Sequence, residues 1–251
     1  TLGKLFIVGI GPGNYENMTV RADRALSESD TIIGYHVYVE LVRGRRPEKE
    51  YLTTPMTMET ERCLMALDEA KKGKTVALVC SGDSGVYGMA GLVLELLLQQ
   101  PEAERPEFDV IAGISAVNAA AAVLGAPLMH DFAVISLSNL LTSWELIKKR
   151  VEMAAAGDFV IALYNPKSHK RVQNIEEVRE IALRYRKPST PVGIVTGASR
   201  DAETKVISTL QDFTKEEINM FSLVIIGNSR TYVREGYMIT PRGYENKEEG
   251  L

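Results

Sequence analysis

The sequence is poor in cysteine, with only Cys63 and Cys80 among its 251 residues. Two cysteines are too few for a disulfide framework, or for an iron–sulfur or zinc centre built on thiolates. Cys63 lies in a helical pattern and Cys80 ends an apolar run, so we expect both to be reduced core residues. We therefore expect no resident metal site.

Long apolar runs and an excess of positive charge are also absent. No apolar run reaches bilayer length, and no basic-then-apolar leader precedes the first predicted strand. We therefore expect a cytoplasmic protein without a membrane segment. A net charge of −4 and a pI near 5.6 argue against nucleic acid as the main partner, because phosphate-backbone binding usually needs an excess of Lys and Arg.

The composition itself is ordinary for a globular protein, with 45% hydrophobic and 25% charged residues. In the first half, β-prone runs alternate with helical patterns, which predicts a parallel sheet with right-handed crossovers. The predicted strands are residues 4–10, 31–34, 75–80 and 108–111, and the helices begin near residues 19, 58, 88 and 115. The second half predicts a β-rich domain with strands at 133–137, 159–164, 191–196 and 223–227, helices at 144–156 and 173–185, and a polar tail at 245–251. We expect two α/β domains, residues 1–113 and 114–251.

Four apolar runs end in loops of small residues, which we expect to form one composite site. In open α/β sheets, ligands bind beyond the carboxyl ends of the strands, and glycines there let the backbone approach a ligand closely. Asp83 would accept hydrogen bonds from a ligand amine or hydroxyl, although an ordinary Gly-Asp turn is the alternative. The loops are Gly9-Ile10-Gly11-Pro12-Gly13, Ser81-Gly82-Asp83-Ser84-Gly85-Val86-Tyr87-Gly88, Ala112-Gly113-Ile114-Ser115-Ala116 and Leu163-Tyr164-Asn165-Pro166.

The first loop does not match the dinucleotide-binding pattern. Pro12 removes a backbone donor, and the last glycine of the loop comes too early. A nicotinamide-dependent oxidoreductase is therefore disfavoured. The first residues of the helix beginning near Ser115 would offer free backbone N–H groups to a ligand.

Together the loops resemble those of the tetrapyrrole (class III) S-adenosylmethionine-dependent methyltransferases. The hallmarks of that family are a Gly-x-Gly-Pro-Gly loop, a Gly-Asp-Pro/Ser-x-x-Tyr-Gly loop and a Pro/Ala-Gly-Ile-Ser-Ala segment, and the resemblance runs over nearly the whole chain. Within the family, segments 34–38, 82–88, 136–138 and 163–168 are similar to the C17-methyltransferases that act on precorrin-3B or cobalt-precorrin-3 in cobalamin biosynthesis. The resemblance implies two α/β domains with the cofactor in the cleft between them, a homodimer, and a polycarboxylate tetrapyrrole substrate.

The resemblance also implies which residues bind S-adenosyl-L-methionine and its product S-adenosyl-L-homocysteine. Asp83 and backbone carbonyls would bind the polar groups of the cofactor, and Pro12 and Val86 its apolar surface. Methyl transfer from a sulfonium needs alignment and exclusion of water more than acid–base groups, which suits a site of small residues. The full set is Pro12, Ser81, Gly82, Asp83, Val86, Tyr87, Ser115, Ala116, Asn165 and Gly197.

The C17 enzymes also contract the macrocycle, a step that moves protons and calls for polar side chains. Each candidate has a structural alternative, such as a helix cap, a turn hydrogen bond or a salt bridge. Our candidates for catalysis are Asn139, Ser138, His130, Asp131 and Tyr164, with Ser136, Thr142 and Arg200 as further polar residues expected near the site.

One loop departs from the family pattern Ser-Leu-Ser-Asp-Leu-Leu-Thr-Pro-Trp. Here Asn139 replaces the carboxylate and Ser143 the proline. An amide cannot act as an acid or a base, so we hypothesise that methyl transfer survives and ring contraction is slower. The alternative is neutral variation at a helix-capping position, where Asn and Asp are nearly equal.

Two further segments could contact a tetrapyrrole. Tyr35, His36 and Tyr38 could stack on a flat macrocycle, and the basic loop of residues 43–46 could bind its carboxylates. Half-buried packing residues and a solvated loop are the alternatives. Relatives with this fold methylate other tetrapyrroles, ribosomal RNA or a modified histidine on a protein, and a non-catalytic cofactor- or corrinoid-binding protein also stays open. Whether the substrate contains cobalt is also left open by the sequence.

Overall fold

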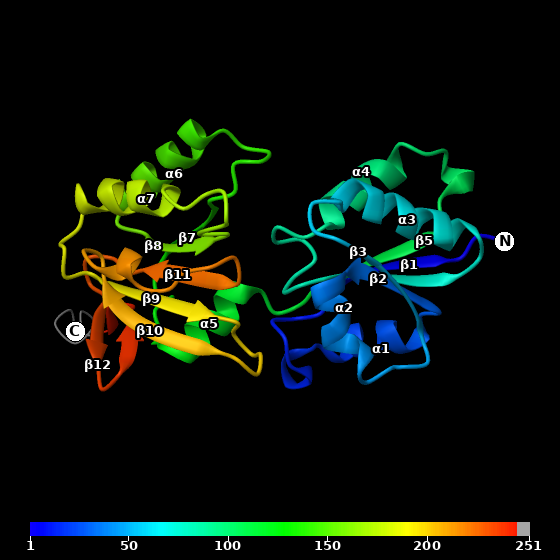
Figure 1. Ribbon diagram of the computed structural model, residues 1–251, viewed down its shortest axis with the longest axis horizontal. Helices are drawn as coiled ribbons and strands as arrows, with labels where there is room; N and C mark the ends of the chain where they lie inside the picture. The colour runs from blue at the N-terminus through cyan, green and yellow to red at the C-terminus, as the bar shows by residue number, and fades with distance from the viewer. Residues whose placement is uncertain (245–251) are drawn as a thin grey trace. The chain divides into compact units, whose positions relative to one another are not determined.

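The computed structural model describes residues 1–244, and the polar tail expected at 245–251 lies outside them. The chain folds into two compact units, Thr1–Ala116 and Val117–Leu251 (Figure 1). Among the described residues, no helix is both long and apolar enough to span a bilayer.

The first unit is built on a five-stranded sheet in the order β3-β2-β4-β1-β5. Every pairing in it is parallel, as the alternation of strands and helices predicts. All five strands therefore end at one edge of the sheet, and the loops that follow them leave from that edge. The strands are β1 (Lys4–Gly9), β2 (Thr31–Tyr35), β3 (Glu50–Thr54), β4 (Thr75–Cys80) and β5 (Glu107–Ile111).

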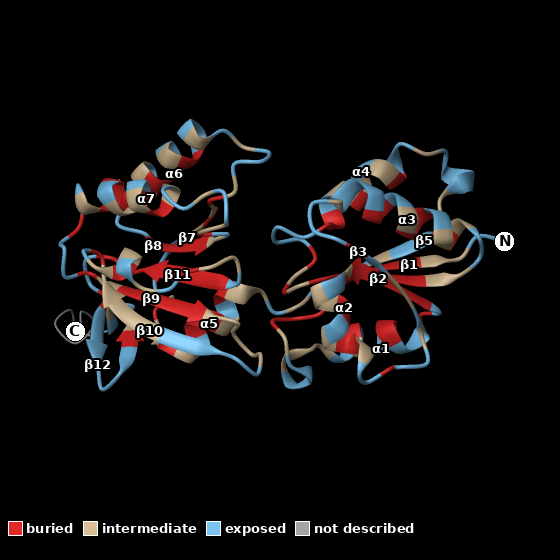
Figure 2. Ribbon diagram, viewed as in Figure 1, coloured by how far each residue is buried: buried red, intermediate tan, exposed pale blue. Residues whose placement is uncertain are grey.

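Two pairs of helices cover the two faces of this sheet (Figure 1). Successive strand residues point to opposite faces. Leu5 and Ile7 accordingly pack with α3 and α4, whereas Phe6 and Val8 pack with α1 and α2. Figure 2 shows the buried residues concentrated in the strands and on the helix faces turned toward them. The helices are α1 (Val20–Glu28), α2 (His36–Arg43), α3 (Glu59–Lys71) and α4 (Ala90–Leu98), with 3-10 turns at Tyr15–Asn17 and Glu102–Glu104.

The solvated-loop interpretation, given as an alternative for two segments of this unit, is wrong for both. Residues 36–38 form the first turn of α2. Arg46, in the basic loop for which solvation was the alternative, is only 8% exposed. Its guanidinium pairs with Asp23 and donates to the Ser27 hydroxyl at 3.1 Å. Arg46 thereby ties α1 to the connection between α2 and β3.

The second unit is β-rich and contains a five-stranded sheet in the order β10-β9-β11-β8-β7. Only β7 and β8 pair in parallel, and β11 runs antiparallel to both β8 and β9. β7, β8 and β9 therefore share one direction, and their carboxyl ends lie at one edge. The strands are β7 (Phe132–Ser136), β8 (Val160–Tyr164), β9 (Pro191–Thr196), β10 (Thr204–Thr209) and β11 (Ser222–Ile226).

Helices α6 and α7 pack on one face of this sheet, around the buried Phe213. Against β9, a Cβ on Gly193 would lie 2.5 Å from the Leu124 side chain, so α5 packs closely there. The remaining elements are α5 (Ala116–Leu124), α6 (Trp144–Ala156), α7 (Asn174–Leu183), the 3-10 turn Phe213–Lys215, and a small sheet of β6 (Gly125–Ala126), β12 (Tyr232–Arg234) and β13 (Tyr237–Ile239).

Both cysteine thiols are free and buried, in agreement with the expectation from the sequence. Burial raises the pKa of Cys63 to about 12 and that of Cys80 to about 11, from an ordinary 9.0. Each native thiol thus holds its proton more tightly than the unfolded thiol does. The two thiols therefore leave the stability of the fold independent of pH below about 9, and the stability falls as the pH rises from there through the folded-state pKa values.

Slow alkylation of the native protein follows from this burial. At pH ~8, iodoacetamide should leave both cysteines unmodified in the native state and label both after unfolding in urea, because the thiolate is the reactive form. Mass spectrometry of the two samples measures this. Rapid labelling of either cysteine in the native protein would contradict the burial.

Candidate cofactor and substrate site

Three glycine loops pack backbone against backbone at the carboxyl edge of the first sheet. The Gly11 and Gly82 amides each donate to the other's carbonyl, at 3.0 and 2.8 Å. A Cβ on Gly113 would lie 2.2 Å from the Gly82 carbonyl oxygen and 2.7 Å from that of Gly9. Three of the four loops that the sequence predicts at one site are thus held together by contacts that only glycine permits.

Asp83 fastens two of these loops to each other. Its Oδ1 accepts from the Gly113 amide and its Oδ2 from the Gly85 amide, both at 2.8 Å. Beneath it, the fully buried Ser84 hydroxyl donates to the Ile111 carbonyl at 3.1 Å. Asp83 therefore has a structural role of its own, and its contact with a cofactor stays a prediction.

The other predicted cofactor residues of this unit differ in exposure. A Cβ on Gly82 would lie 3.4 Å from the Ser115 Cα and 3.5 Å from the Ala116 amide nitrogen, so these residues border the same loop. Pro12 is buried, whereas Tyr87 is 54% exposed and has a left-handed backbone with φ of 54°. Such a conformation costs a non-glycine residue about 1–3 kcal/mol and is enriched at functional sites.

In the second unit, the ends of β7 and β8 bring together three of the predicted residues. The Ser136 hydroxyl accepts from the Asn165 side-chain amide at 3.0 Å and from the Ser138 backbone amide at 3.3 Å. Asn165 also has a left-handed backbone, with φ of 50°. Gly197, with φ of 62°, follows β9 at the same edge.

Tyr164 forms a hydrogen bond with the first turn of α5. Its hydroxyl accepts from the Val117 amide at 2.9 Å, so one of the N–H groups expected to face a ligand has a partner within the protein. Its predicted catalytic role stays a prediction beside this structural one.

Arg171 is a residue that the sequence does not single out. Its Nη1 donates to the carbonyls of Leu137 and Asn165, at 3.0 and 3.1 Å, and so joins the loops after β7 and β8. Burial lowers the pKa of its guanidinium. Nothing in the basic stretch of residues 167–172 marks this arginine, because its partners are defined only by the fold.

The structure does not bring His130 and Asp131 to this edge. They precede β7 while Ser138 follows it, and a five-residue strand spans about 17 Å. Both side chains are exposed, and the His130 Nδ1 accepts from the Asp131 backbone amide at 2.9 Å.

The capping explanation for Asn139 is wrong. The cap of α6 is Ser143, whose hydroxyl accepts from the Leu146 amide at 3.3 Å. Asn139 lies earlier in the loop and is exposed. Thr142 lies in the same loop, and Arg200 follows Gly197 with its guanidinium 5.2 Å from the centre of the Phe221 ring.

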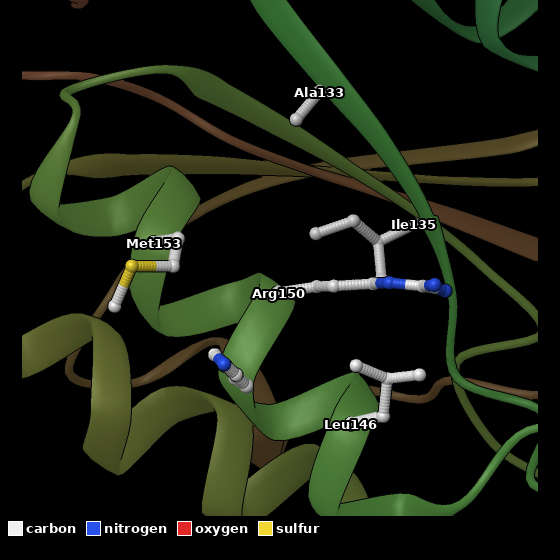
Figure 3. Close-up of a pocket in the computed structure, with 6 residues that line it drawn as sticks. Ala133, Ile135, Leu146, Arg150 and Met153 are labelled. Atoms are coloured by element: carbon white, nitrogen blue, oxygen red, sulfur yellow. The ribbon is translucent and has the colours of Figure 1, made fainter.

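A groove of about 390 Å³ lies between β7 and α6 (Figure 3). Its lining combines four apolar side chains with two cations and contains none of the predicted site residues: Ala133, Ile135, Leu146, Lys149, Arg150 and Met153. Among residues 1–244, no cluster of three or more His, Cys, Asp or Glu side chains is arranged to hold a metal ion.

These features define an α/β protein whose first unit carries a candidate ligand site made of backbone loops. The family model of the tetrapyrrole (corrin/porphyrin) methylases matches residues 4–214, and the chain belongs to this family. It is similar to the "Probable cobalt-factor III C(17)-methyltransferase" of Salmonella typhimurium, with 47% identity over 96% of this chain and 99% of the relative. It is also 51% identical to the "Cobalt-factor III methyltransferase" of Priestia megaterium, over 98% of this chain but 46% of that relative, so it spans about half of that protein.

A solved structure agrees with the whole fold. The crystal structure of the methyltransferase CobJ superposes with a TM-score of 0.88 at 35% identity, covering 95% of this chain and all of that one. The α/β fold class expected from the sequence is therefore confirmed.

Proposed function

We propose that this protein methylates C17 of a cobalt-containing precorrin-3-type macrocycle with S-adenosylmethionine and contracts the ring, as a step of cobalamin biosynthesis. The observation that carries this proposal is the 47% identity over 99% of the Salmonella typhimurium relative, whose name contains the C17 reaction. The names of both similar relatives contain cobalt-factor III, which favours the cobalt-containing substrate over a metal-free precorrin.

The loops of the first unit suit S-adenosylmethionine. When bound, this cofactor supplies a methyl group that is already activated, so the protein has to bind, orient and exclude water. Residues 85–88 are exposed and offer backbone groups, while the Val86 and Tyr87 side chains offer an apolar surface. Asp83 keeps this segment fixed relative to the Gly113 loop. The roles of Asn165 and Gly197 at the same cofactor stay predictions.

The test is a single incubation with methyl-labelled S-adenosylmethionine and cobalt-precorrin-3, with product mass and visible spectrum followed together. A gain of one methyl group with a changed chromophore is expected. No transfer while S-adenosylhomocysteine still binds would favour another acceptor, and metal-free precorrin would be tried next. If no acceptor is methylated, the protein would be a cofactor or corrinoid carrier. Failure to bind S-adenosylhomocysteine at all would overturn the cofactor assignment.

The homodimer implied by the family resemblance is part of the proposal, and sedimentation of the purified protein tests it. A monomer at micromolar concentration would contradict it. The cytoplasmic location expected from the sequence stays a prediction.

Asn139→Asp is expected to speed ring contraction about tenfold or more without changing methyl transfer, since a carboxylate restores a group that can move a proton. Asn139 is not the helix cap, so the change should leave the stability of α6 unaltered. Single-turnover spectra and product mass separate the two steps. Ser143→Ala is the matched control, which should lower stability by about 1 kcal/mol with no effect on contraction. Equal contraction rates in Asn139→Asp and the parent protein would refute the hypothesis.

A further inference from the structure

An aromatic corner follows β2 in the first unit, formed by Tyr35, His36 and Tyr38. The Tyr35 ring packs edge-on against both of the others, with centroid distances of 4.7 Å to His36 and 5.1 Å to Tyr38. His36 is the first residue of α2 and is exposed. The corner therefore presents one imidazole flanked by flat rings.

The parallel sheet places this corner at the edge that carries the glycine loops. β2 pairs directly with β4, in the register Ile33 to Leu78. A Cβ on Gly34 would lie 2.5 Å from the Val79 side chain, so the end of β2 packs tightly against β4. Because neighbouring strands lie about 4.8 Å apart, His36 leaves the sheet one strand away from the loop that contains Asp83.

The imidazole of His36 forms no polar interaction with the described part of the chain. Apart from the ring contact with Tyr35, no hydrogen bond or ion pair involves it among residues 1–244. The carboxylate of Glu40, one turn along α2, is engaged by Arg43 at 3.0 Å. By contrast, the Nδ1 of His130 accepts a hydrogen bond from the Asp131 backbone amide.

We infer that His36 is an axial ligand to the cobalt of the bound macrocycle, with Tyr35 and Tyr38 beside the ring. This inference rests on the proposed function. Imidazole nitrogen is a preferred ligand of first-row transition metals. A tetrapyrrole already holds its metal with four equatorial nitrogens, so a single protein side chain completes the site and no ligand cluster is needed. His36 would then act as a positioning residue that selects cobalt-containing macrocycles and fixes the face presented for methylation.

Electron paramagnetic resonance of the Co(II) macrocycle tests this ligand directly. The protein is mixed anaerobically with Co(II)-factor III and S-adenosylhomocysteine. One axial nitrogen splits the cobalt lines into triplets, whereas water does not. The wild-type protein and His36→Ala are compared with His169→Ala, which removes another exposed histidine. Binding of S-adenosylhomocysteine to each variant checks that the first unit is folded.

We expect triplets in the wild type and in His169→Ala, and none in His36→Ala. His36→Ala should also bind the cobalt compound about tenfold more weakly, as is typical for disturbing a metal's ligand environment, while its affinity for the metal-free ring stays the same. Triplets that persist in His36→Ala would overturn the inference, as would bound Co(II)-factor III without triplets in the wild type. Either result would leave the proposed function intact. A wild-type protein that binds no Co(II)-factor III would overturn both.

Discussion

Gly113→Ala is expected to destabilise the first unit by about 3 kcal/mol or more and to abolish binding of S-adenosylhomocysteine. The new methyl group would lie 2.2 Å from the Gly82 carbonyl oxygen and 2.7 and 2.8 Å from the carbonyl oxygen and carbon of Gly9. All three atoms belong to the backbone, so no rotamer change can relieve the overlap. The glycine loops would have to separate, and overpacking of this severity lies at or beyond the upper end of the usual range.

Gly91→Ala is the matched control for this experiment. Gly91 lies in α4, and a Cβ there would meet no atom within 4 Å. Alanine should stabilise that helix by up to about 1 kcal/mol. Urea unfolding and titration with S-adenosylhomocysteine measure both variants. Parent-like stability and affinity in Gly113→Ala would show that the loops do not need this close approach.

The glycine loops could be predicted from the sequence because their signal is local. Glycine widens the range of backbone conformations and proline narrows it, so both mark a turn within a few residues. Each loop also follows an apolar run that the sequence marks as a strand. Alternation with helices then implied parallel strands, which bring the ends of β1, β4 and β5 to one edge. Gly11 and Gly82 meet there as expected.

The partners of the polar side chains could not be predicted in this way. Asp83 and Gly113 are thirty residues apart in the sequence, and their hydrogen bond exists only because β4 and β5 both flank β1. Arg171 is a similar case, because its two acceptors come from different strand ends. Helix α2 was missed because Tyr, His and Val have little preference for helix, and packing of Val39 and Val42 on the sheet decides the outcome.

The separation of His130 from Ser138 was, by contrast, readable in the sequence. The two residues flank a predicted strand, and the length of that strand alone puts them at opposite edges of the sheet. The position of a residue before or after a strand therefore excludes catalytic candidates more reliably than its residue type does.

Asp83→Ala is expected to lower the stability of the first unit by about 4 kcal/mol and Asp83→Asn by about 2 kcal/mol. Each carboxylate oxygen accepts one backbone N–H, and hydrogen bonds to a charged group contribute about 1.5–3 kcal/mol each. In Asp83→Asn, the new side-chain amide keeps one acceptor oxygen but turns its NH₂ toward the second N–H, so one of the two bonds is lost. The affinity for S-adenosylhomocysteine should fall in the same order, by tenfold or more in Asp83→Ala.

Asp109→Asn removes the same charge elsewhere in the unit and serves as the control. Asp109 is a half-exposed residue of β5 that pairs with Lys4 at 3.2 Å, and an exposed pair contributes about 0–1 kcal/mol. Urea unfolding and calorimetric titration of the three variants distinguish two roles for Asp83. If the Asp83 carboxylate joins the loops, replacing it lowers both the free energy of unfolding and the affinity for S-adenosylhomocysteine. If it only contacts the cofactor, replacing it lowers the affinity and leaves the free energy of unfolding unchanged. The second pattern would mean that the Gly113 and Gly85 amides are held by the loop backbone alone, and Asp83 would then be a direct cofactor ligand.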